Sequence, residues 1–138
     1  MKLYNQFIKE KTEASNNFEG IGFAFNQSQF EEMLDKLEAE PKDLFNLGYG
    51  TFILKNRYDD LMNMINKYDT RLKEAMKEYD FSYSAFVYEL ANHEYNITFD
   101  YDDVLDVLNL TEDEIKNNPI LNKAFEEAKK TVIMTSDF

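Results

Sequence analysis

The chain contains no cysteine and no tryptophan, and it has one histidine, two prolines and four glycines. Without cysteine, disulfides, thiolate zinc sites and cysteine nucleophiles are excluded, and a reducing compartment fits this composition. A single imidazole, His93, also excludes any metal site that requires a pair of histidines. Because helix-breaking residues are few, we expect long helices with few interruptions.

Long apolar runs are also missing from the sequence. No stretch approaches the roughly 20 apolar residues that a membrane-spanning helix requires. The first ten residues, MKLYNQFIKE, lack the continuous apolar core of a secretory signal. We therefore expect a cytoplasmic protein that has no contact with a membrane.

Basic residues are absent from one long segment, residues 78–115, which we call the acidic block. It contains eleven Asp and Glu residues and no Lys or Arg, and it therefore carries nearly all of the net charge of −12. Phosphate groups would be repelled by such a segment, so direct binding of nucleic acid is not expected. A basic protein surface would be attracted and steered towards it.

Apolar residues make up 43% of the chain, with 12 Phe and 9 Tyr, which is enough for the core of one domain over residues 1–138. Apolar alternation at 21–25 and an apolar run at 49–54 predict strands, and residues 97–99 are a candidate short edge strand. Gly22 and Ala24 indicate an element packed closely over one face of the first strand. The pattern leaves parallel and antiparallel pairing open.

Helical spacing dominates the rest of the sequence. Apolar residues at steps of four and three predict a long helix over 61–79, and a core helix is favoured over a coiled coil. Ser28, Thr111 and Asn118 are expected to cap further helices. The predicted fold class is α+β, with about five to six helices and a small sheet of two to three strands. The N-terminal helix, residues 1–17, is expected to be loosely attached.

No motif predicts catalysis, a cofactor or a metal. His93 lies near Glu89 and Glu94, but the zinc-protease pattern needs a second histidine where Ile97 stands, so we expect His93 to end a helix. The segment from Asp100 to Asp103 starts like a calcium loop, and the pattern then fails at position 104. The two Gly-x-Gly pieces, 20–22 and 48–50, do not continue into a phosphate-binding loop. We therefore predict no enzyme, and an enzyme using His93 with a neighbouring carboxylate is a third-ranked hypothesis.

Four segments occur in an order that resembles a known group of proteins. They are FAFNQSQFEEM (23–33), GYGTFILK (48–55), FVYELANHEY (86–95) and LNLTEDEI (108–115). Over roughly residues 18–130 the chain resembles a family of small acidic proteins of phages and mobile elements in low-GC and gut bacteria. No activity is established for that family, so the resemblance implies no catalytic residues. It implies a bacterial host cytoplasm and, by analogy, inhibition of host defence, as anti-CRISPR and anti-restriction proteins do.

These observations lead to the hypothesis of a non-enzymatic inhibitor. It would bind a basic host protein, such as a CRISPR effector or a restriction enzyme, through a surface that imitates the charge of nucleic acid. The alternative is a structural or regulatory phage protein that binds another protein or self-associates through the 61–79 helix, as in a homodimer. The expected partner-binding residues are Glu89, His93, Glu94, Asp100, Asp102, Asp103, Asp106, Glu112, Asp113 and Glu114.

Overall fold

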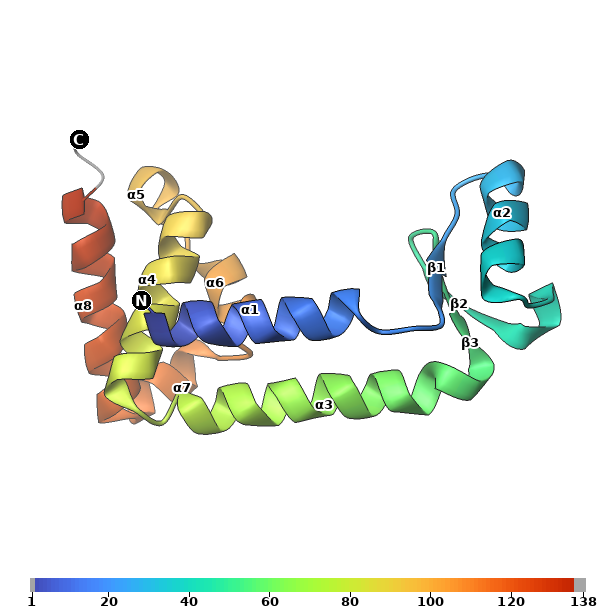
Figure 1. Ribbon diagram of the computed structural model, residues 1–138. Helices are drawn as coiled ribbons and strands as arrows, with labels where there is room; N and C mark the ends of the chain where they lie inside the picture. Colours follow the sequence, from blue (N-terminus) through green and yellow to red (C-terminus); the bar gives the residue numbers. More distant parts are fainter. Residues whose placement is uncertain (1, 136–138) are drawn as a thin grey trace. The chain divides into compact units, whose positions relative to one another are not determined.

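The computed structural model describes residues 2–135, and this part of the chain forms eight α-helices and three short β-strands (Figure 1). The predicted class, a mostly helical α+β fold with a small sheet, is confirmed. The chain divides into two compact units. Unit 1 comprises residues 1–12 and 69–138, and unit 2 comprises residues 13–68. The single domain expected over the whole chain stays a prediction.

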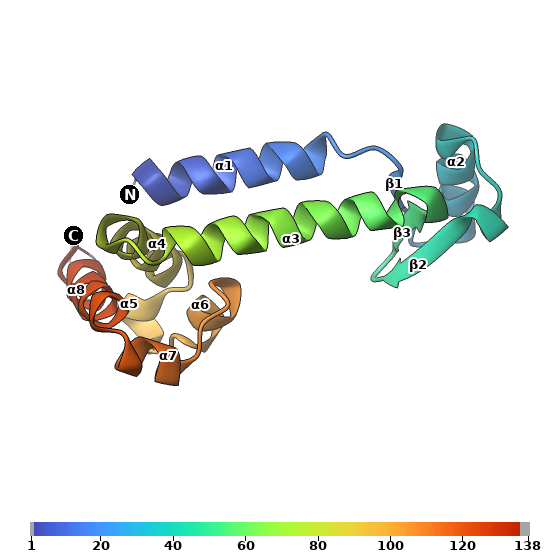
Figure 2. The ribbon, with the colours of Figure 1, turned by 90° about the horizontal axis from the view of Figure 1, so that it is seen from below.

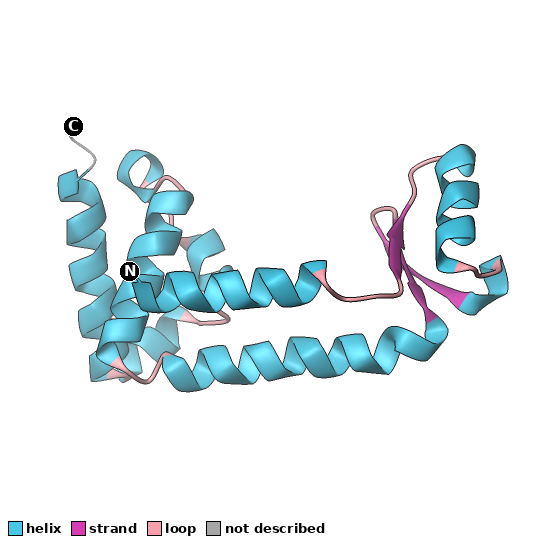
Figure 3. Ribbon diagram, viewed as in Figure 1, coloured by secondary structure: helices cyan, strands magenta, loops and turns pink. Residues whose placement is uncertain are grey.

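The sheet lies in unit 2 and is antiparallel throughout (Figure 3). It consists of β1 (Ile21–Phe23), β2 (Leu44–Gly48) and β3 (Thr51–Leu54), with β3 in the centre. The strands predicted at 21–25 and 49–54 are confirmed over residues 21–23 and 51–54. Sequence reasoning missed β2, because its residues are mostly exposed and show no alternation of apolar and polar side chains.

Helix α2 (Gln27–Leu37) packs on one face of this sheet (Figure 1). A Cβ atom on Gly22 would lie 2.4 Å from Met33 Cγ, which leaves room only for glycine at this position. The rings of Phe30 and Phe52 meet edge to face, with their centroids 5.3 Å apart. The close approach predicted from Gly22 is therefore confirmed, and α2 is the element that makes it.

The cap of α2 differs from the prediction. Asn26, in extended conformation, precedes the helix, and its Oδ1 accepts a hydrogen bond from the backbone N–H of Gln29 at 2.9 Å. Ser28 lies within the first turn, so the predicted Ser28 cap is wrong. Asparagine and serine are almost equally good caps, and the sequence spacing alone did not separate two neighbouring candidates.

The β2–β3 connection is a tight turn of Gly48, Tyr49 and Gly50, and all three residues have positive φ. Tyr49 has φ 53°, a left-handed conformation that is costly for a bulky side chain, and its side chain is 99% exposed. Phe25 lies against Gly50, where a Cβ atom would be 2.4 Å from its ring. Phe25 is also exposed, so unit 2 has apolar side chains in solvent at this end of its sheet.

Helix α3 (Tyr58–Ala75) follows a single 3₁₀ turn, Lys55–Arg57, and continues from unit 2 into unit 1. The predicted 61–79 helix is confirmed up to Ala75 and is wrong beyond it. Glu78 has φ −93° and ψ 133°, an extended conformation that separates α3 from the next helix. Tyr79 continues the apolar spacing by coincidence, because it begins that next helix.

Unit 1 is built around α4 (Tyr79–Asn92) and α8 (Pro119–Thr135), which lie side by side (Figure 1). Alanines at the contact are fully buried and allow the two backbones to approach closely, and the rings of Phe86 and Phe125 have their centroids 5.0 Å apart. Three short helices connect them, namely α5 (Tyr95–Thr98), α6 (Asp102–Val107) and α7 (Glu112–Asn117). Figure 2 shows α7 beside the beginning of α8.

The first part of α1 (Lys2–Asn16) completes the core of unit 1. Tyr4 and Phe7 are buried, and their rings contact Phe81 at centroid distances of 5.8 and 6.0 Å. Tyr4 also contacts Tyr88 edge to face at 5.4 Å. This part of α1 is therefore anchored on α4 by aromatic packing.

Local predictions in the 93–118 segment had mixed outcomes. His93 ends α4, as expected, and the side chains of Thr111 and Asn118 cap α7 and α8 as predicted. The edge strand at 97–99 is wrong, because Ile97 and Thr98 are helical and Phe99 is left-handed. Among residues 2–135, no helix has both the length and the apolarity to cross a membrane.

Candidate functional site

Glu89 and the partly buried His93 lie one helical turn apart at the end of α4. Glu89 is only 4% exposed, and its Oε1 accepts a hydrogen bond from the Tyr4 hydroxyl at 3.0 Å. The other carboxylate oxygen, Oε2, is 3.3 Å from His93 Nε2. Each carboxylate oxygen thus has a polar neighbour within the fold, and the burial of Glu89 corrects the expectation that it is available to a partner. Burial, followed by the charge of Glu89, raises the pKa of Tyr4 and keeps its hydroxyl protonated as a donor.

The remaining acidic residues of the prediction are exposed. Glu94 has φ 58° and connects α4 to α5. The carboxylate of Asp100 accepts a hydrogen bond from the backbone N–H of Asp102 at 2.9 Å, which shapes the approach to α6. We call the exposed carboxylates of this region the acidic surface, and it consists of Asp100, Asp102, Asp103, Asp106, Glu112, Asp113 and Glu114.

A hydrogen bond links the two helices that present the acidic surface. The Tyr101 hydroxyl, just before α6, donates to Glu112 Oε1, at the start of α7, at 2.7 Å. Tyr101 in turn packs on Phe125 of α8, with ring centroids 5.1 Å apart. The hydrogen bond to Glu112, together with burial, raises the pKa of Tyr101 to about 12. The link therefore persists at physiological pH and connects two acidic segments that are about ten residues apart in sequence.

No cation neutralises the acidic surface within the described part of the chain. None of the ion pairs formed among residues 2–135 includes any of its seven carboxylates. Lys129, on α8, lies over the Tyr101 ring, but its ammonium group pairs with Glu126 at 2.9 Å and also lies over the Phe125 ring. The carboxylates are left to water or to a partner.

Some of these carboxylates also have a structural role. Asp102 and Asp103 are in the first turn of α6, and three acids occupy the first turn of α7, where the helix dipole favours negative charge. The Thr111 hydroxyl caps α7 and also donates to Glu114 Oε1 at 3.2 Å. Helix stabilisation accounts for these first-turn positions, whereas Asp106 lies outside the first turn of α6 and has no such role.

Metal binding finds no support in the arrangement of side chains. Within residues 2–135, no group of three or more His, Asp and Glu side chains is placed to hold a metal ion. Sequence reasoning missed a pocket in unit 1 that is lined by α3 and by residues 108–121. Its two walls are more than thirty residues apart in the chain, and no local pattern indicated that they meet.

Comparison with known proteins identifies the family of the chain. The profile of DUF7659, a family of unknown function, matches residues 4–131. The chain belongs to this family. Since the match spans residues 4–131, the DUF7659 region contains the Tyr4–Glu89 contact and the whole acidic surface. No curated protein and no solved structure matches the chain.

Proposed function

We propose that this DUF7659 protein is a non-enzymatic inhibitor that binds a basic surface of another protein through its acidic surface. The single observation that carries the proposal is the set of seven exposed carboxylates on and beside α6 and α7 without a cationic partner in the described chain. Exposed charges of one sign raise the association rate with a surface of the opposite sign. They also disfavour binding to nucleic acid itself.

The favoured target is a nucleic-acid-handling protein of a bacterial host, such as a restriction enzyme or a CRISPR effector. Such proteins present basic grooves that neutralise closely spaced phosphates. Helices α6 and α7 offer carboxylates at short intervals, and the Tyr101–Glu112 hydrogen bond holds the two helices together at one end. The resemblance to phage and mobile-element proteins supports an anti-defence role as the biological context of this binding.

DNA cleavage by purified restriction endonucleases and RNA-guided nucleases, measured with and without the protein, tests the proposal. Inhibition is expected at low salt and is expected to weaken as the ionic strength rises, because salt screens charges beyond about 10 Å at 0.1 M. Absence of inhibition across the panel at low salt would remove nucleases as the target class.

Two variants distinguish an effect of the acidic surface on inhibition from an effect of the total charge of the protein. The first replaces four of its carboxylates with amides of nearly equal shape, by D102N, D103N, D106N and D113N. The second, a matched control, removes four exposed carboxylates outside the acidic surface, by E13Q, E32Q, D35N and D59N. The first variant is expected to lose inhibition and the second to retain it, with circular dichroism confirming the fold of both. Equal loss in both would assign the effect to net charge alone.

A structural or regulatory role through self-association is the second candidate, and it is favoured by the exposed aromatic residues of unit 2. Phe23, Phe25 and Tyr49 are exposed, and monomeric proteins rarely leave several large apolar side chains together in solvent. Light scattering at increasing protein concentration tests this candidate. A concentration-dependent dimer that F25S abolishes would support it, and a strict monomer would reject it.

A further inference from the structure

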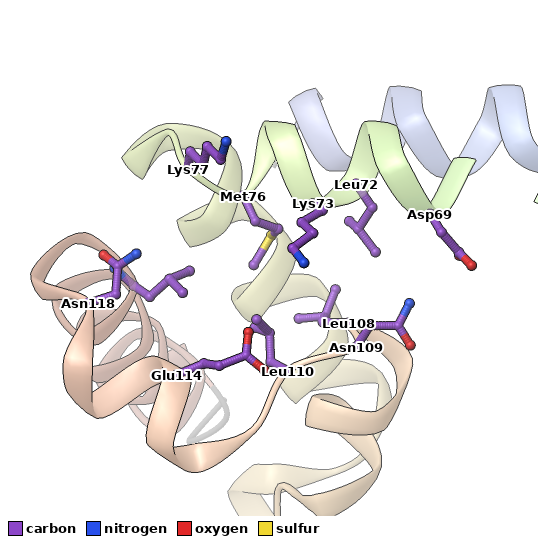
Figure 4. Close-up of a pocket in the computed structure, with 11 residues that line it drawn as sticks. Asp69, Leu72, Lys73, Met76, Lys77, Leu108, Asn109, Leu110, Glu114 and Asn118 are labelled. Atoms are coloured by element: carbon purple, nitrogen blue, oxygen red, sulfur yellow. The ribbon is translucent and has the colours of Figure 1, made fainter. Parts of the chain in front are cut away.

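Unit 1 contains a pocket of about 320 Å³ between the last turns of α3 and the chain from Leu108 to Leu121 (Figure 4). Its floor is apolar and is formed by four buried side chains, Leu72, Met76, Leu108 and Leu121. Pockets of this size with an apolar lining and a few polar groups are typical of small-molecule sites.

Opposite charges face this floor from the two walls. Figure 4 shows Lys73 reaching from α3 and Glu114 reaching from α7 into the space between them. Neither group belongs to an ion pair among residues 2–135, so the two charges are too far apart to neutralise each other directly. A second lysine of the lining, Lys77, is already paired with Glu74 at 3.0 Å.

A hydrogen-bond donor completes the polar part of the lining. Asn118 Oδ1 accepts from the backbone N–H groups of Ile120 and Leu121 at 3.0 and 3.2 Å, which fixes the orientation of the amide. The Asn118 NH₂ group therefore points away from the helix and has no hydrogen-bond acceptor among the described residues. The pocket thus offers Lys73, unpaired among the described residues, the carboxylate of Glu114 and a neutral donor around an apolar floor, and a second carboxylate, Asp69, borders it on the α3 wall (Figure 4).

The matching ligand has an apolar body with a carboxylate and an ammonium group side by side. We propose that this pocket binds a free α-amino acid with a large apolar side chain, such as leucine. Its carboxylate pairs with Lys73, its ammonium group pairs with Glu114, and its side chain covers Met76 and Leu108. A fatty acid could pair only with Lys73, and an alkylamine could pair only with Glu114. Either ligand would leave the opposite charge unpaired beside an apolar surface. The proposal for this pocket does not depend on the proposed inhibition, although Glu114 belongs both to the pocket and to the acidic surface.

NMR of the full-length protein labelled with ¹³C at the methionine methyl groups tests the proposal. Met76 reports on the pocket, while Met33, buried in unit 2, is the internal control. L-leucine is expected to shift the Met76 signal in a saturable manner, with a Kd of about 1 mM for a ligand of this size in an open pocket, and to leave Met33 unmoved. An unmoved Met76 signal well above that concentration would overturn the proposal.

Two analogues of leucine test the charged contacts. L-leucinamide lacks the carboxylate and N-acetyl-L-leucine lacks the ammonium group, and each is expected to bind about fivefold more weakly than leucine. Equal binding of all three compounds would show an apolar cavity without charge recognition and would also overturn the proposal.

A single substitution tests the contact between Lys73 and the ligand carboxylate. K73Q is expected to remove the preference for leucine over leucinamide, and the matched control K77Q is expected to keep it. Because Lys73 is not part of the acidic surface, K73Q is also expected to inhibit nucleases normally. Retained preference in K73Q would contradict the assigned contact, whereas failed nuclease inhibition by the unmodified protein bears only on the proposed function.

Discussion

The aromatic core between the helices of unit 1 contrasts with the exposed aromatic side chains at the hairpin end of unit 2, although Phe99 of unit 1 is also exposed. Unit 1 buries Tyr4, Phe86 and Phe125 between helices, whereas unit 2 leaves Phe25 and Tyr49 in solvent. Chain length explains part of the difference, because a unit of fewer than about 60 residues has too little volume to bury all of its apolar side chains. The comparison indicates that the α4–α8 pair provides most of the stability and that unit 2 has surface available for contacts.

The units also differ in charge. The acidic surface belongs to unit 1, while the exposed β2–β3 hairpin of unit 2, LFNLGYG (44–50), contains no charged residue. A partner of unit 1 is therefore attracted over a distance and with strong salt dependence. A partner of the hairpin would gain affinity by burying apolar area, with little dependence on salt.

The largest effect is expected at the centre of unit 1. F86A removes a fully buried ring that contacts Phe125, and it should lower the free energy of unfolding by about 4 kcal/mol. Urea denaturation followed by circular dichroism measures this change. The corresponding change in unit 2, F25A, removes an exposed ring and should cost less than about 0.5 kcal/mol. Similar losses in the two variants would contradict the comparison.

A smaller loss is expected where α1 meets α4. Y4F leaves one oxygen of the buried Glu89 without its donor and should lower the free energy of unfolding by about 2 kcal/mol. Since the pKa of Tyr4 is raised in the folded protein, this contribution is fully present below the ordinary tyrosine pKa of about 10 and is lost only as the pH rises through the raised value. Urea titrations of both proteins at pH 7 and pH 9 should therefore give the same difference, and a difference that disappears by pH 9 would contradict the assignment.

Unit 2 should be most sensitive at its closest packing contact. G22A places a Cβ atom 2.4 Å from Met33 Cγ and should cost about 1.5 kcal/mol through overpacking. Hydrogen exchange of the β1 and β3 amides measures the loss, and the α4 and α8 amides serve as the reference. Unchanged exchange in β1 and β3 would show that Met33 moves aside without cost.

The smallest effect, a gain, is expected at the hairpin turn. Y49N keeps the left-handed backbone at φ 53° with a residue that tolerates it, and it should stabilise the protein by about 0.5 kcal/mol. Thermal unfolding measures the gain. If Y49N is instead destabilising, the Tyr49 side chain makes a contact in solution, such as one with a second copy.

Helices with a clear apolar stripe were predictable from the sequence, and breaks between them were not. The apolar spacing from Leu61 to Tyr79 continues without interruption across the turn at Glu78. The reason is that the first residue of α4 happens to follow the last residue of α3 by four positions. The short strand β2 was missed for the opposite reason, since Phe45 and Leu47 are both exposed and produce no alternation.

The exposure of most acids of the candidate site was predictable, but the position of Glu89 was overlooked. Glu89 lies three residues after Phe86 and just before Leu90, which places it on the buried face of α4. Its partner Tyr4 could not be identified from sequence, because the contact joins segments 85 residues apart. The same limit applies to Lys73 and Glu114, which face one pocket from distant helices.

The discontinuity of unit 1 has a consequence for the order in which the chain acquires structure. Residues 1–12 leave the ribosome before unit 2, yet the α4 residues that bury Tyr4 and Phe7 are made only after all of unit 2 has been synthesised. Until then these two rings remain in water, while the hairpin and α2, whose contacts are local in sequence, can already form. The N-terminal helix is thus expected to stay undocked at least until α4 has been synthesised, and during that period the nascent protein exposes two large aromatic side chains to proteases and to aggregation.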